Sequence, residues 1–384
     1  MTPPRVAVVH DWLDTWGGGE NVLAEILLMY PDADLYTLVD FFSDDRRRRI
    51  GGRIARTSFL QHVPGARNHF RKLLPLFPRA IEAFDLRGYD LILSSSHAVA
   101  KGVRTTLTQL HVCYCYTPMR YVWDLREEYL GPHGLSTGLR GMVARRVLDH
   151  LRDWDRASSS RVNQFIAISQ FVRGRIARTY GRDASVVYPP VDTDFYVPTD
   201  GQKPSPGYYL TASRHVPYKR IDLIAAAFRA LPDRRLIIAG TGPETARIRA
   251  AAGSNVEFVG EVPRERLREL LQHARAFVFA AEEDFGILPV EAQACGTPVI
   301  SLRRGGVVET IRGIDDGVGA TGMFYEEQTA AAITAAVIAF EAQPAGIAAQ
   351  DCRAQALLFA AARFREQYAA LVDAHWRAFA AVRR

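Results

Sequence analysis

Short apolar segments alternate along the first half of the chain with amphipathic stretches of helical length. The apolar segments predict buried strands over residues 6–10, 35–39, 91–95, 111–116, 165–169 and 186–188. Strands that alternate with helices in this way are typical of βαβ units, in which helices cover a parallel sheet. The pattern therefore predicts an α/β lobe over residues 1–188.

The alternation stops at a proline-rich segment and then begins again. Residues 189–207 contain Pro189, Pro190, Pro198, Pro204 and Pro206 and therefore predict an interdomain linker. Beyond it, predicted strands cover residues 209–213, 236–239, 256–259, 276–279 and 299–302, and predicted helices begin near residues 221, 244, 263, 288 and 328. We assign residues 208–350 to a second α/β lobe. Residues 351–384 are rich in alanine and predict a C-terminal helix that returns to the first lobe.

Composition narrows the class of protein. The chain has 384 residues, of which 48% are hydrophobic and 23% charged, so it can form two sizeable cores. No apolar run reaches the ~18–20 residues of a membrane-spanning helix, and the first residues lack the pattern of a signal peptide, so we expect a cytoplasmic protein. The net charge of +6 does not by itself imply nucleic acid. The cysteines fit no zinc spacing and are expected to be buried thiols; they are Cys113, Cys115, Cys295 and Cys352.

The most informative motif follows the strand predicted at residues 276–279. Glu283 lies in the loop after that strand, and Pro289 suits the first turn of a helix that would also hold Glu291. The backbone N–H groups at such a helix start can bind an anion, and two carboxylates beside them can accept hydrogen bonds from sugar hydroxyls. The residues that would offer those groups are Phe285, Gly286 and Ile287. A helix start that is acidic only to suit the macrodipole stays an open alternative.

Two further motifs lie at the ends of predicted strands. Arg214 and Lys219 follow the first strand after the linker, where two cations suit a diphosphate, although solvated surface charge is an alternative. Gly17, Gly18 and Gly19 follow the first strand of the chain, where exposed N–H groups can cradle a phosphate or a sugar. A plain tight turn is the competing interpretation of the glycines.

The remaining motifs are weaker evidence for a ligand site. Residues 239–245 resemble a dinucleotide fingerprint, but Thr245 stands where the third glycine would be, so NAD is disfavoured. His97 and Arg120 each follow a strand of the first lobe, where His97 can orient a hydroxyl and Arg120 can meet a phosphate, although a lone histidine is more often structural. Pairs of the form Asp-x-Asp at residues 32/34, 153/155 and 192/194 are interpreted as turns or caps, so we expect no metal site.

The segment EEDFGILPVEAQACGTPVI, with its Glu283-x7-Glu291 spacing, resembles the signature of retaining glycosyltransferases of family 4. The phrases SRHVPYKRID, AGTGPE and VEFVGEV before this segment, and GGVVE after it, occur in the order expected of that family. The first-lobe phrases VHDWLDTWGGGE, SSSHAVAKG and CYCYTPMRYVWD resemble a bacterial subgroup described as mannosyltransferases of polysaccharide or O-antigen synthesis. The resemblance implies the GT-B fold, with two Rossmann-like lobes whose parallel sheets face a central cleft.

The resemblance also implies roles for residues. In the second lobe, Arg214 and Lys219 would bind the donor diphosphate, Glu291 the ribose, and Glu283 the transferred sugar. The remaining donor-binding positions are Phe285, Gly286, Ile287, Leu288, Gly260, Val262, Gly18 and Gly19. Tyr116 and His97 are assigned to catalysis, and Trp16 and Arg120 to the acceptor. One departure stands out, because relatives commonly carry histidine where this chain has Tyr116.

The implied reaction is the metal-independent, retaining transfer of a hexose to a lipid-linked or polysaccharide acceptor bound by the first lobe. GDP-mannose is the preferred donor. Cations and a helix start would stabilise the leaving diphosphate, and lobe closure would exclude water. A UDP-sugar-dependent enzyme of the same fold, a nucleotide-sugar epimerase and a non-catalytic carbohydrate-binding scaffold are the alternatives. The basic and aromatic residues 67–84 suggest peripheral contact with an anionic membrane, and a packed helix with solvated arginines is the competing interpretation.

Overall fold

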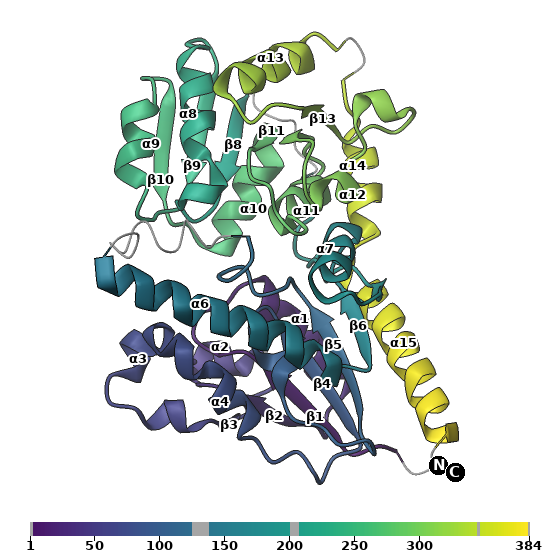
Figure 1. Ribbon diagram of the computed structural model, residues 1–384. Coiled ribbons are helices and arrows are strands. Elements are labelled where there is room, and N and C mark those ends of the chain that lie inside the picture. Colours follow the sequence, from purple (N-terminus) through teal and green to yellow (C-terminus); the bar gives the residue numbers. More distant parts are fainter. Residues whose placement is uncertain (1–2, 125–137, 200–206, 344–345, 383–384) are drawn as a thin grey trace. The chain divides into compact units, whose positions relative to one another are not determined.

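The computed structural model describes residues 3–124, 138–199, 207–343 and 346–382 (Figure 1). The chain divides into two compact units, the first made of Met1–Pro190 with Phe364–Arg384 and the second of Val191–Arg363. Each unit is built on one parallel sheet with helices on both sides (Figure 1). We call them the first and the second lobe.

The first lobe holds a seven-stranded sheet with the order β3-β2-β1-β4-β5-β6-β7, in which every pair is parallel. Its strands are β1 (Val6–His10), β2 (Asp34–Thr37), β3 (Arg56–Thr57), β4 (Leu91–Ser96), β5 (Leu110–Cys115), β6 (Gln164–Ala167) and β7 (Ala184–Val186). Its helices are α1 (Gly18–Met29), α2 (Asp44–Arg48), α3 (Ala66–His69), α4 (Phe77–Glu82), α6 (Gly138–Ser158), α7 (Gln170–Tyr180) and α15 (Ala361–Val382). Short 3₁₀ turns connect several of them, at Phe59–His62, Phe70–Leu76, Ala100–Gly102 and Ser159–Arg161.

The second lobe holds a six-stranded sheet with the order β10-β9-β8-β11-β12-β13, again parallel throughout. Its strands are β8 (Tyr208–Ala212), β9 (Arg235–Ala239), β10 (Val256–Gly260), β11 (Ala274–Phe279), β12 (Val299–Leu302) and β13 (Gly322–Tyr325). Its helices are α8 (Ile221–Arg229), α9 (Thr245–Ala251), α10 (Arg264–His273), α11 (Ile287–Ala294), α12 (Val307–Thr310), α13 (Ala330–Glu341) and α14 (Ala349–Leu357), with 3₁₀ turns at Pro217–Lys219 and Ile314–Asp316.

The predicted strands are confirmed in both lobes, and two strands were not predicted. β3 consists only of Arg56 and Thr57, and neither residue is apolar, so the hydrophobic pattern does not predict a strand there. This edge strand is defined by its pairing with Tyr36 and Thr37 of β2. β13 begins at Gly322, which lies so close to Val299 of β12 that an added Cβ would stand 2.2 Å from its carbonyl oxygen. Glycine is more typical of turns than of strands, so the sequence does not predict a strand that begins at Gly322.

The later part of the predicted C-terminal helix forms α15 and packs on the first lobe, as predicted, whereas its first residues belong to the separate helix α14 of the second lobe. Phe364 and Tyr368 of α15 lie against Tyr114 of β5, with ring centroids 5.6 and 6.0 Å apart. Arg365 pairs with Glu25 of α1 at 2.6 Å. The buried aromatic contacts remove apolar surface from water and hold α15 beside the sheet.

Half of the predicted linker is an ordered part of the second lobe. Val191 pairs with Ala360, and Arg353 donates hydrogen bonds to the carbonyl oxygens of Thr193 and Tyr196 at 2.8 and 2.7 Å. The guanidinium of Arg264 lies 4.0 Å from the centre of the Phe195 ring. Residues 200–206 fall outside the described part of the chain.

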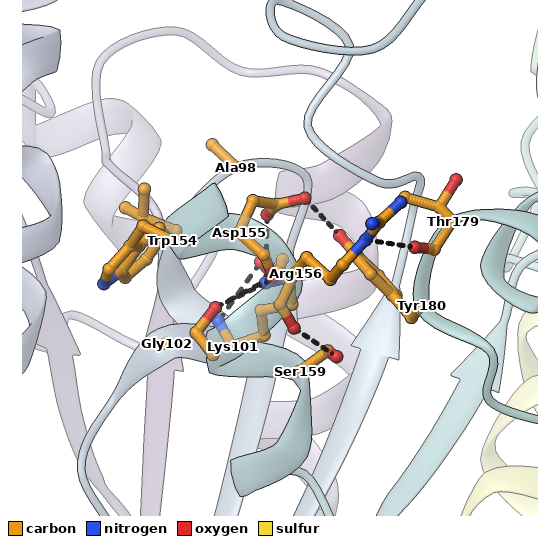
Figure 2. A network of polar contacts seen from close by, with 12 residues as sticks. Ala98, Lys101, Gly102, Trp154, Asp155, Arg156, Ser159, Thr179 and Tyr180 are labelled. Carbon is orange, nitrogen blue, oxygen red and sulfur yellow. Dashed lines mark hydrogen bonds and ion pairs between the residues drawn. The ribbon is translucent and has the colours of Figure 1, made fainter. Parts of the chain in front are cut away.

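A buried ion pair fixes α6 in the first lobe (Figure 2). Lys101 and Asp155 are 1% and 0% exposed, and the ammonium group lies 2.9 Å from the carboxylate of Asp155. Trp123 and Tyr180 each donate a hydrogen bond to the same carboxylate at 2.8 Å. The interpretation of the 153/155 pair as a turn or cap is therefore wrong for Asp155, which stabilises the core from within a helix.

The four cysteines are free and buried, as expected from their spacing. Within the described residues, no helix combines the length and the apolar character that crossing a membrane requires.

Candidate active site

Both sheets reverse their strand order at one point, and several candidate residues of each lobe lie in the loops that leave it. In the first lobe the reversal falls between β1 and β4, and in the second between β8 and β11. Where the order reverses, the loops that leave two neighbouring strands turn to opposite faces and open a crevice at the carboxyl ends of the strands. The topology therefore directs attention to the loops after β1, β4, β8 and β11.

The loop after β8 carries the two predicted cations of the second lobe. Arg214 is exposed, and its carbonyl oxygen accepts a hydrogen bond from the backbone of Val216 at 2.9 Å. Lys219 ends the 3₁₀ turn and is followed by Arg220, a non-glycine residue with a φ of 51°. This left-handed residue turns the chain directly into α8, so the cations stay at the strand end instead of entering the helix.

The loop after β11 brings Glu283 to Lys219. The ammonium group of Lys219 donates a hydrogen bond to Oε1 of Glu283, and the two side chains are only 15% and 18% exposed. Two motifs that lie far apart in the sequence thus meet at the reversal point of the sheet. The contact places a cation and a carboxylate side by side in a partly buried position.

Two glycines of a neighbouring loop hold Glu283 in place. Gly305 pairs with Glu283 in a β-bridge, and Gly306 donates a backbone hydrogen bond to its carbonyl oxygen at 2.7 Å. A Cβ on Gly305 would stand 2.4 Å from that oxygen, and a Cβ on Gly306 would stand 2.2 Å from the carbonyl oxygen of Asp284. Only residues without a side chain allow this approach.

The start of α11 leaves its backbone N–H groups without a side-chain cap. Gly286 is the N-cap residue, with a φ of 85°, and it offers no side chain to accept from the first turn. Phe285 before it is 3% exposed and packs on Phe359, with ring centroids 5.4 Å apart. Ile287 and Leu288 open the helix. The amides of this turn form an anion-binding geometry close to Glu283 in sequence.

Glu291 lies one turn further along α11, in an environment that favours its neutral form. Burial raises the pKa of Glu291 to about 7, Arg264 acts in the opposite direction, and Asp192 raises it further. Tyr196 supplies a hydrogen bond that favours the carboxylate. Asp192 and Tyr196 come from the segment interpreted as a linker, so sequence reasoning missed them, and no pattern in that proline-rich stretch marks them as part of a site.

The residues that resemble a dinucleotide fingerprint have a packing role. A Cβ on Gly240 would stand 1.9 Å from the carbonyl oxygen of Ser213, and a Cβ on Gly242 would stand 2.3 Å from that of His215. Thr245 accepts a hydrogen bond from the amide of Gly242 at 3.0 Å. The glycines let this loop lie against the loop after β8, which accounts for them without a dinucleotide.

Gly260 and Val262 lie at the end of β10 and just after it. Gly260 has a φ of 71°, and its carbonyl oxygen accepts a hydrogen bond from Gly240 at 2.6 Å. An added Cβ at Gly260 would meet nothing within 4 Å, and Val262 is half-buried. The structure thus ties the strand end to the fingerprint-like loop and leaves space beside Gly260.

In the first lobe, His97 is held by a carboxylate that sequence reasoning did not single out. Asp11 follows β1, is 0% exposed, and accepts hydrogen bonds from four consecutive backbone N–H groups after β4, at 2.6, 3.0, 2.7 and 2.7 Å. Its carboxylate also lies 3.0 Å from Nδ1 of His97. The signal for Asp11 was its place directly after a predicted strand.

Asp11 and His97 shift each other's pKa toward the charged forms. Burial acts to raise the pKa of Asp11, but His97 outweighs it and the pKa falls to about 2. Burial acts to lower the pKa of His97, whereas Asp11 and Glu20 raise it, and the net shift is upward.

Tyr116 holds the glycine loop. Its hydroxyl donates a hydrogen bond to the carbonyl oxygen of Gly19 at 2.9 Å and lies 2.8 Å from the hydroxyl of Ser95. An added Cβ on Gly19 would stand 3.6 Å from the Tyr116 ring. The amide of Gly17 donates to Glu20 at 2.8 Å, and α1 begins at Gly18. The three glycines therefore form a helix start that is fixed from two sides.

The two residues predicted for the acceptor have other surroundings. Trp16 is half-buried, donates its indole N–H to Asn21 at 2.7 Å and lies 5.9 Å from the Phe42 ring. Arg120 is half-buried in the turn after β5. The structure brings His97, Tyr116 and Gly19 together through the hydroxyl and the ring of Tyr116.

Family models match nearly the whole chain. The model described as Glycosyltransferase Family 4 matches residues 16–195, and the model described as Glycosyl transferases group 1 matches residues 194–357. The chain belongs to glycosyltransferase family 4. The relationship that the sequence motifs implied is confirmed.

Individual proteins similar to this family 4 chain match only part of its length. It is 32% identical, over 215 residues, to the GDP-mannose-dependent alpha-(1-6)-phosphatidylinositol monomannoside mannosyltransferase of Mycolicibacterium smegmatis, which covers 47% of this chain and 54% of the relative. It is 27% identical, over 188 residues, to the D-inositol 3-phosphate glycosyltransferase of Mycobacteroides abscessus, over 44% and 41% of the two chains. The alignments thus span about half the length of each curated relative.

Solved structures establish the GT-B fold. The structure of Anabaena Alr3699/HepE in complex with UDP and glucose matches 96% of this chain and 99% of its own, with a TM-score of 0.68 at 18% identity. Sucrose-phosphate synthase from Thermosynechococcus elongatus matches 97% and 100%, with a TM-score of 0.70 at 19% identity. The two parallel-stranded lobes of the family 4 chain are therefore those of a GT-B protein.

Metal ligands do not gather in the part of the chain that the structure describes. No three His, Cys, Asp or Glu side chains come together there as they would around a cation.

Proposed function

We propose that the protein is a retaining glycosyltransferase that moves a hexose from a nucleotide sugar to a lipid-linked or polysaccharide acceptor without a metal. The observation that carries the proposal is the contact between Lys219 and Glu283 at the reversal point of the second sheet. A cation suits the donor diphosphate, and a carboxylate suits the hydroxyls of the sugar attached to it.

The chemistry follows from the charge that develops as the sugar leaves. Breaking the bond between the sugar and the phosphate puts negative charge on the diphosphate. Arg214, Lys219 and the uncapped amides at the start of α11 can stabilise that charge. The acceptor hydroxyl attacks the same face that the diphosphate leaves, and the departing phosphate takes its proton, so the configuration at the anomeric carbon is retained.

GDP-mannose is the preferred donor. A relative at 32% identity is named for GDP-mannose-dependent mannosyl transfer. A UDP-sugar is the second candidate, because the HepE structure that shares the fold contains UDP and glucose. An epimerase and a non-catalytic carbohydrate-binding scaffold are less well supported, since the combined set of Arg214, Lys219, Glu283 and Glu291 favours a transferase.

A thermal-shift panel tests the donor. The wild type is heated with GDP-mannose, UDP-glucose, dTDP-glucose and the corresponding free nucleotides, with EDTA present throughout. We expect GDP-mannose to raise the melting temperature most. Stabilisation by a UDP- or dTDP-sugar alone contradicts the mannose assignment but keeps the transferase, and no stabilisation by any nucleotide contradicts both.

The acceptor is proposed to lie at an anionic membrane, reached by the basic segment of the first lobe. Phe70, Leu74 and Phe77 of this segment are buried in the core of the lobe, so it packs as a helical layer. Arg67, Lys72 and Arg79 point outward and are exposed. The attraction is therefore electrostatic, at ~1 kcal/mol for each basic residue close to the surface.

Flotation with liposomes tests the membrane proposal. We expect the wild type to float with vesicles of phosphatidylcholine and phosphatidylglycerol at low salt. It should be released by 0.5 M NaCl, because salt shortens the Debye length from about 10 Å at 0.1 M to roughly 3–5 Å and screens the attraction. The variant R67Q/K72Q/R79Q should stay in the bottom fraction. The matched control R229Q/R235Q/R266Q removes three exposed arginines of the second lobe and should float like the wild type. Equal flotation of both variants would refute the assignment of this surface.

A further inference from the structure

The Asp11–His97 pair spans the strand reversal of the first sheet, the counterpart of the Lys219–Glu283 contact in the second. Asp11 leaves β1 and His97 leaves β4, and these strands are neighbours in the sheet. Because loops that leave this point border a crevice, a side chain held here is well placed to meet a ligand.

The hydrogen bonds of the Asp11 carboxylate are made within the protein. Its two oxygens accept from the backbone of His97, Ala98, Val99 and Ala100, and its side chain is fully buried. The carboxylate cannot reach a ligand, but it fixes the loop that carries His97. It also fixes the ring, because Nδ1 of His97 lies 3.0 Å from Oδ2 of Asp11.

His97 presents the opposite end of its ring. With Nδ1 facing Asp11, Nε2 is the nitrogen available to a ligand, and 29% of the side chain is exposed. Trp12 packs edge-on against the imidazole, with ring centroids 4.5 Å apart, so the ring has little freedom to rotate. Asp11 and Trp12 thus hold the imidazole of His97 in one orientation.

The other polar side chains of this cluster are turned toward one another, and among the described residues Nε2 of His10 is buried without a hydrogen-bond partner. The Tyr116 hydroxyl contacts Gly19 and Ser95, and Nδ1 of His10 lies 3.0 Å from the Ser95 hydroxyl. Glu20 accepts from the amide of Gly17 and lies 3.7 Å from Nε2 of His10. These four side chains hold the glycine loop in place, which leaves His97 as the member turned outward.

We propose that His97, oriented by Asp11, donates a hydrogen bond from Nε2 to a hydroxyl oxygen of the acceptor sugar beside the reacting hydroxyl, and that Tyr116 is a positioning residue for the glycine loop. This inference rests on the proposed transferase function. The reacting hydroxyl keeps its own proton for the departing phosphate, so the hydrogen bond orients the acceptor and moves no proton.

The role requires the charged imidazole, and the surroundings decide how far that form persists. Asp11 and Glu20 favour it, whereas burial and Arg71 oppose it, and the pKa of His97 is raised overall. His10 and Tyr116 also face the ring, at 6.5 and 6.2 Å between centroids. Because protonated His97 is the donor, acceptor binding is strongest below the pKa of His97 and weakens as the pH rises through it.

The test compares transfer with hydrolysis of the same donor. Wild type, H97Q and the control H273Q, whose histidine is half-buried at the end of α10 in the second lobe, are given GDP-mannose with octyl α-D-mannopyranoside or with water alone. We expect H97Q to raise the KM for the mannoside by about tenfold, the factor that corresponds to one hydrogen bond of ~1.4 kcal/mol, and to lose more of the transfer rate than of the hydrolysis rate. H273Q should match the wild type in both reactions. In the wild type, KM should rise as the pH increases.

A second measurement does not depend on turnover. Carbon-13 NMR of the histidine ring, assigned through H97Q, follows the titration of His97 in the wild type and in D11N. We expect the pKa of His97 to fall in D11N, and 50 mM methyl α-D-mannopyranoside to shift the wild-type resonance more than that of D11N. An unchanged titration in D11N, equal losses of transfer and hydrolysis in H97Q, or a KM that rises toward acid pH would overturn the inference. Absence of any donor turnover by the wild type would instead refute the proposed function.

Discussion

At the scale of single residues, Glu291 is the carboxyl group whose surroundings most favour protonation near neutral pH. Its burial beside Asp192 raises its pKa to about 7. Glu291 is the residue that we propose to bind the ribose. Hydroxyl groups donate hydrogen bonds to a carboxylate better than to a carboxylic acid, so we expect donor binding to be coupled to ionisation of Glu291. The same shift makes the empty second lobe sensitive to pH, because the unfolded chain releases this proton near pH 4.5.

The sign of the effect can be tested with Glu291→Gln. Between about pH 4.5 and pH 7 the folded protein keeps a proton that the unfolded chain has lost, so wild-type stability falls as the pH rises. We expect the variant to gain about 2–3 kcal/mol over the wild type at pH 8 and nothing at pH 4.5, by urea unfolding at both pH values. Glu366→Gln, at an exposed site on α15, should show no such trend. A gain that is equal at both pH values would contradict the assigned pKa.

At the scale of elements, the loops that leave the strands are held by glycines that pack against neighbouring backbone. Gly306 lies against Asp284 and Phe285, with distances of 2.2 and 2.6 Å from an added Cβ to the carbonyl oxygen and to Cα. Gly306→Ala must therefore displace the loop that carries Glu283. We expect a loss of about 1–3 kcal/mol in stability and a lower affinity for the donor.

A glycine substitution elsewhere provides the control for Gly306→Ala. Gly174 lies within α7, and its nearest neighbour would be the end of the Arg178 side chain at 3.4 Å. Gly174→Ala should gain about 0.5–1 kcal/mol, because alanine favours a helix. Thermal unfolding and calorimetric titration with GDP-mannose measure both quantities. Donor affinity that is unchanged in Gly306→Ala would show that this loop does not position the site.

The Lys101–Asp155 pair holds α6 to the sheet of the first lobe, as Figure 2 shows. Lys101→Met leaves the buried carboxylate without its cation and should cost about 3–5 kcal/mol. Lys101→Met/Asp155→Asn removes that charge while keeping an oxygen for Tyr180, so we expect it to recover most of the loss. Arg152→Met breaks an exposed pair with Asp149 and should cost less than about 1 kcal/mol. Urea unfolding of the four proteins would contradict this account if the single and double variants were equally unstable.

The sequence predicted elements better than it predicted contacts. β1 and β12 have the bounds that their apolar runs indicated, because a buried parallel strand is apolar on both faces. Asp192 and Tyr196 were assigned to a linker, since prolines surround them and their partners, Arg264 and Arg353, lie far along the chain. The Asp11–His97 contact was missed for the same reason, because each residue was seen only beside its own strand.

At the scale of the whole molecule, each lobe repeats one arrangement. A parallel sheet reverses its strand order, and the loops on either side of the reversal join one carboxylate to one cationic or imidazole side chain. The motifs indicated both lobes and the two residues, Lys219 and Glu283, that are in contact in the second. They did not indicate the buried carboxylate of the first, whose role depends on backbone amides that no side-chain pattern marks.

The central claim is that the second lobe breaks the bond between a sugar and a nucleoside diphosphate, and release of GDP from GDP-mannose measures it most directly. We expect the wild type to release GDP in the presence of EDTA and Glu283→Gln to do so at least about 10²-fold more slowly, with a circular dichroism spectrum like that of the wild type. Arg229→Gln, on the exposed end of α8, should release GDP at the wild-type rate. Release that is equal in wild type and Glu283→Gln, or no release of nucleotide from GDP-, UDP- or dTDP-sugars by the wild type, would contradict the account.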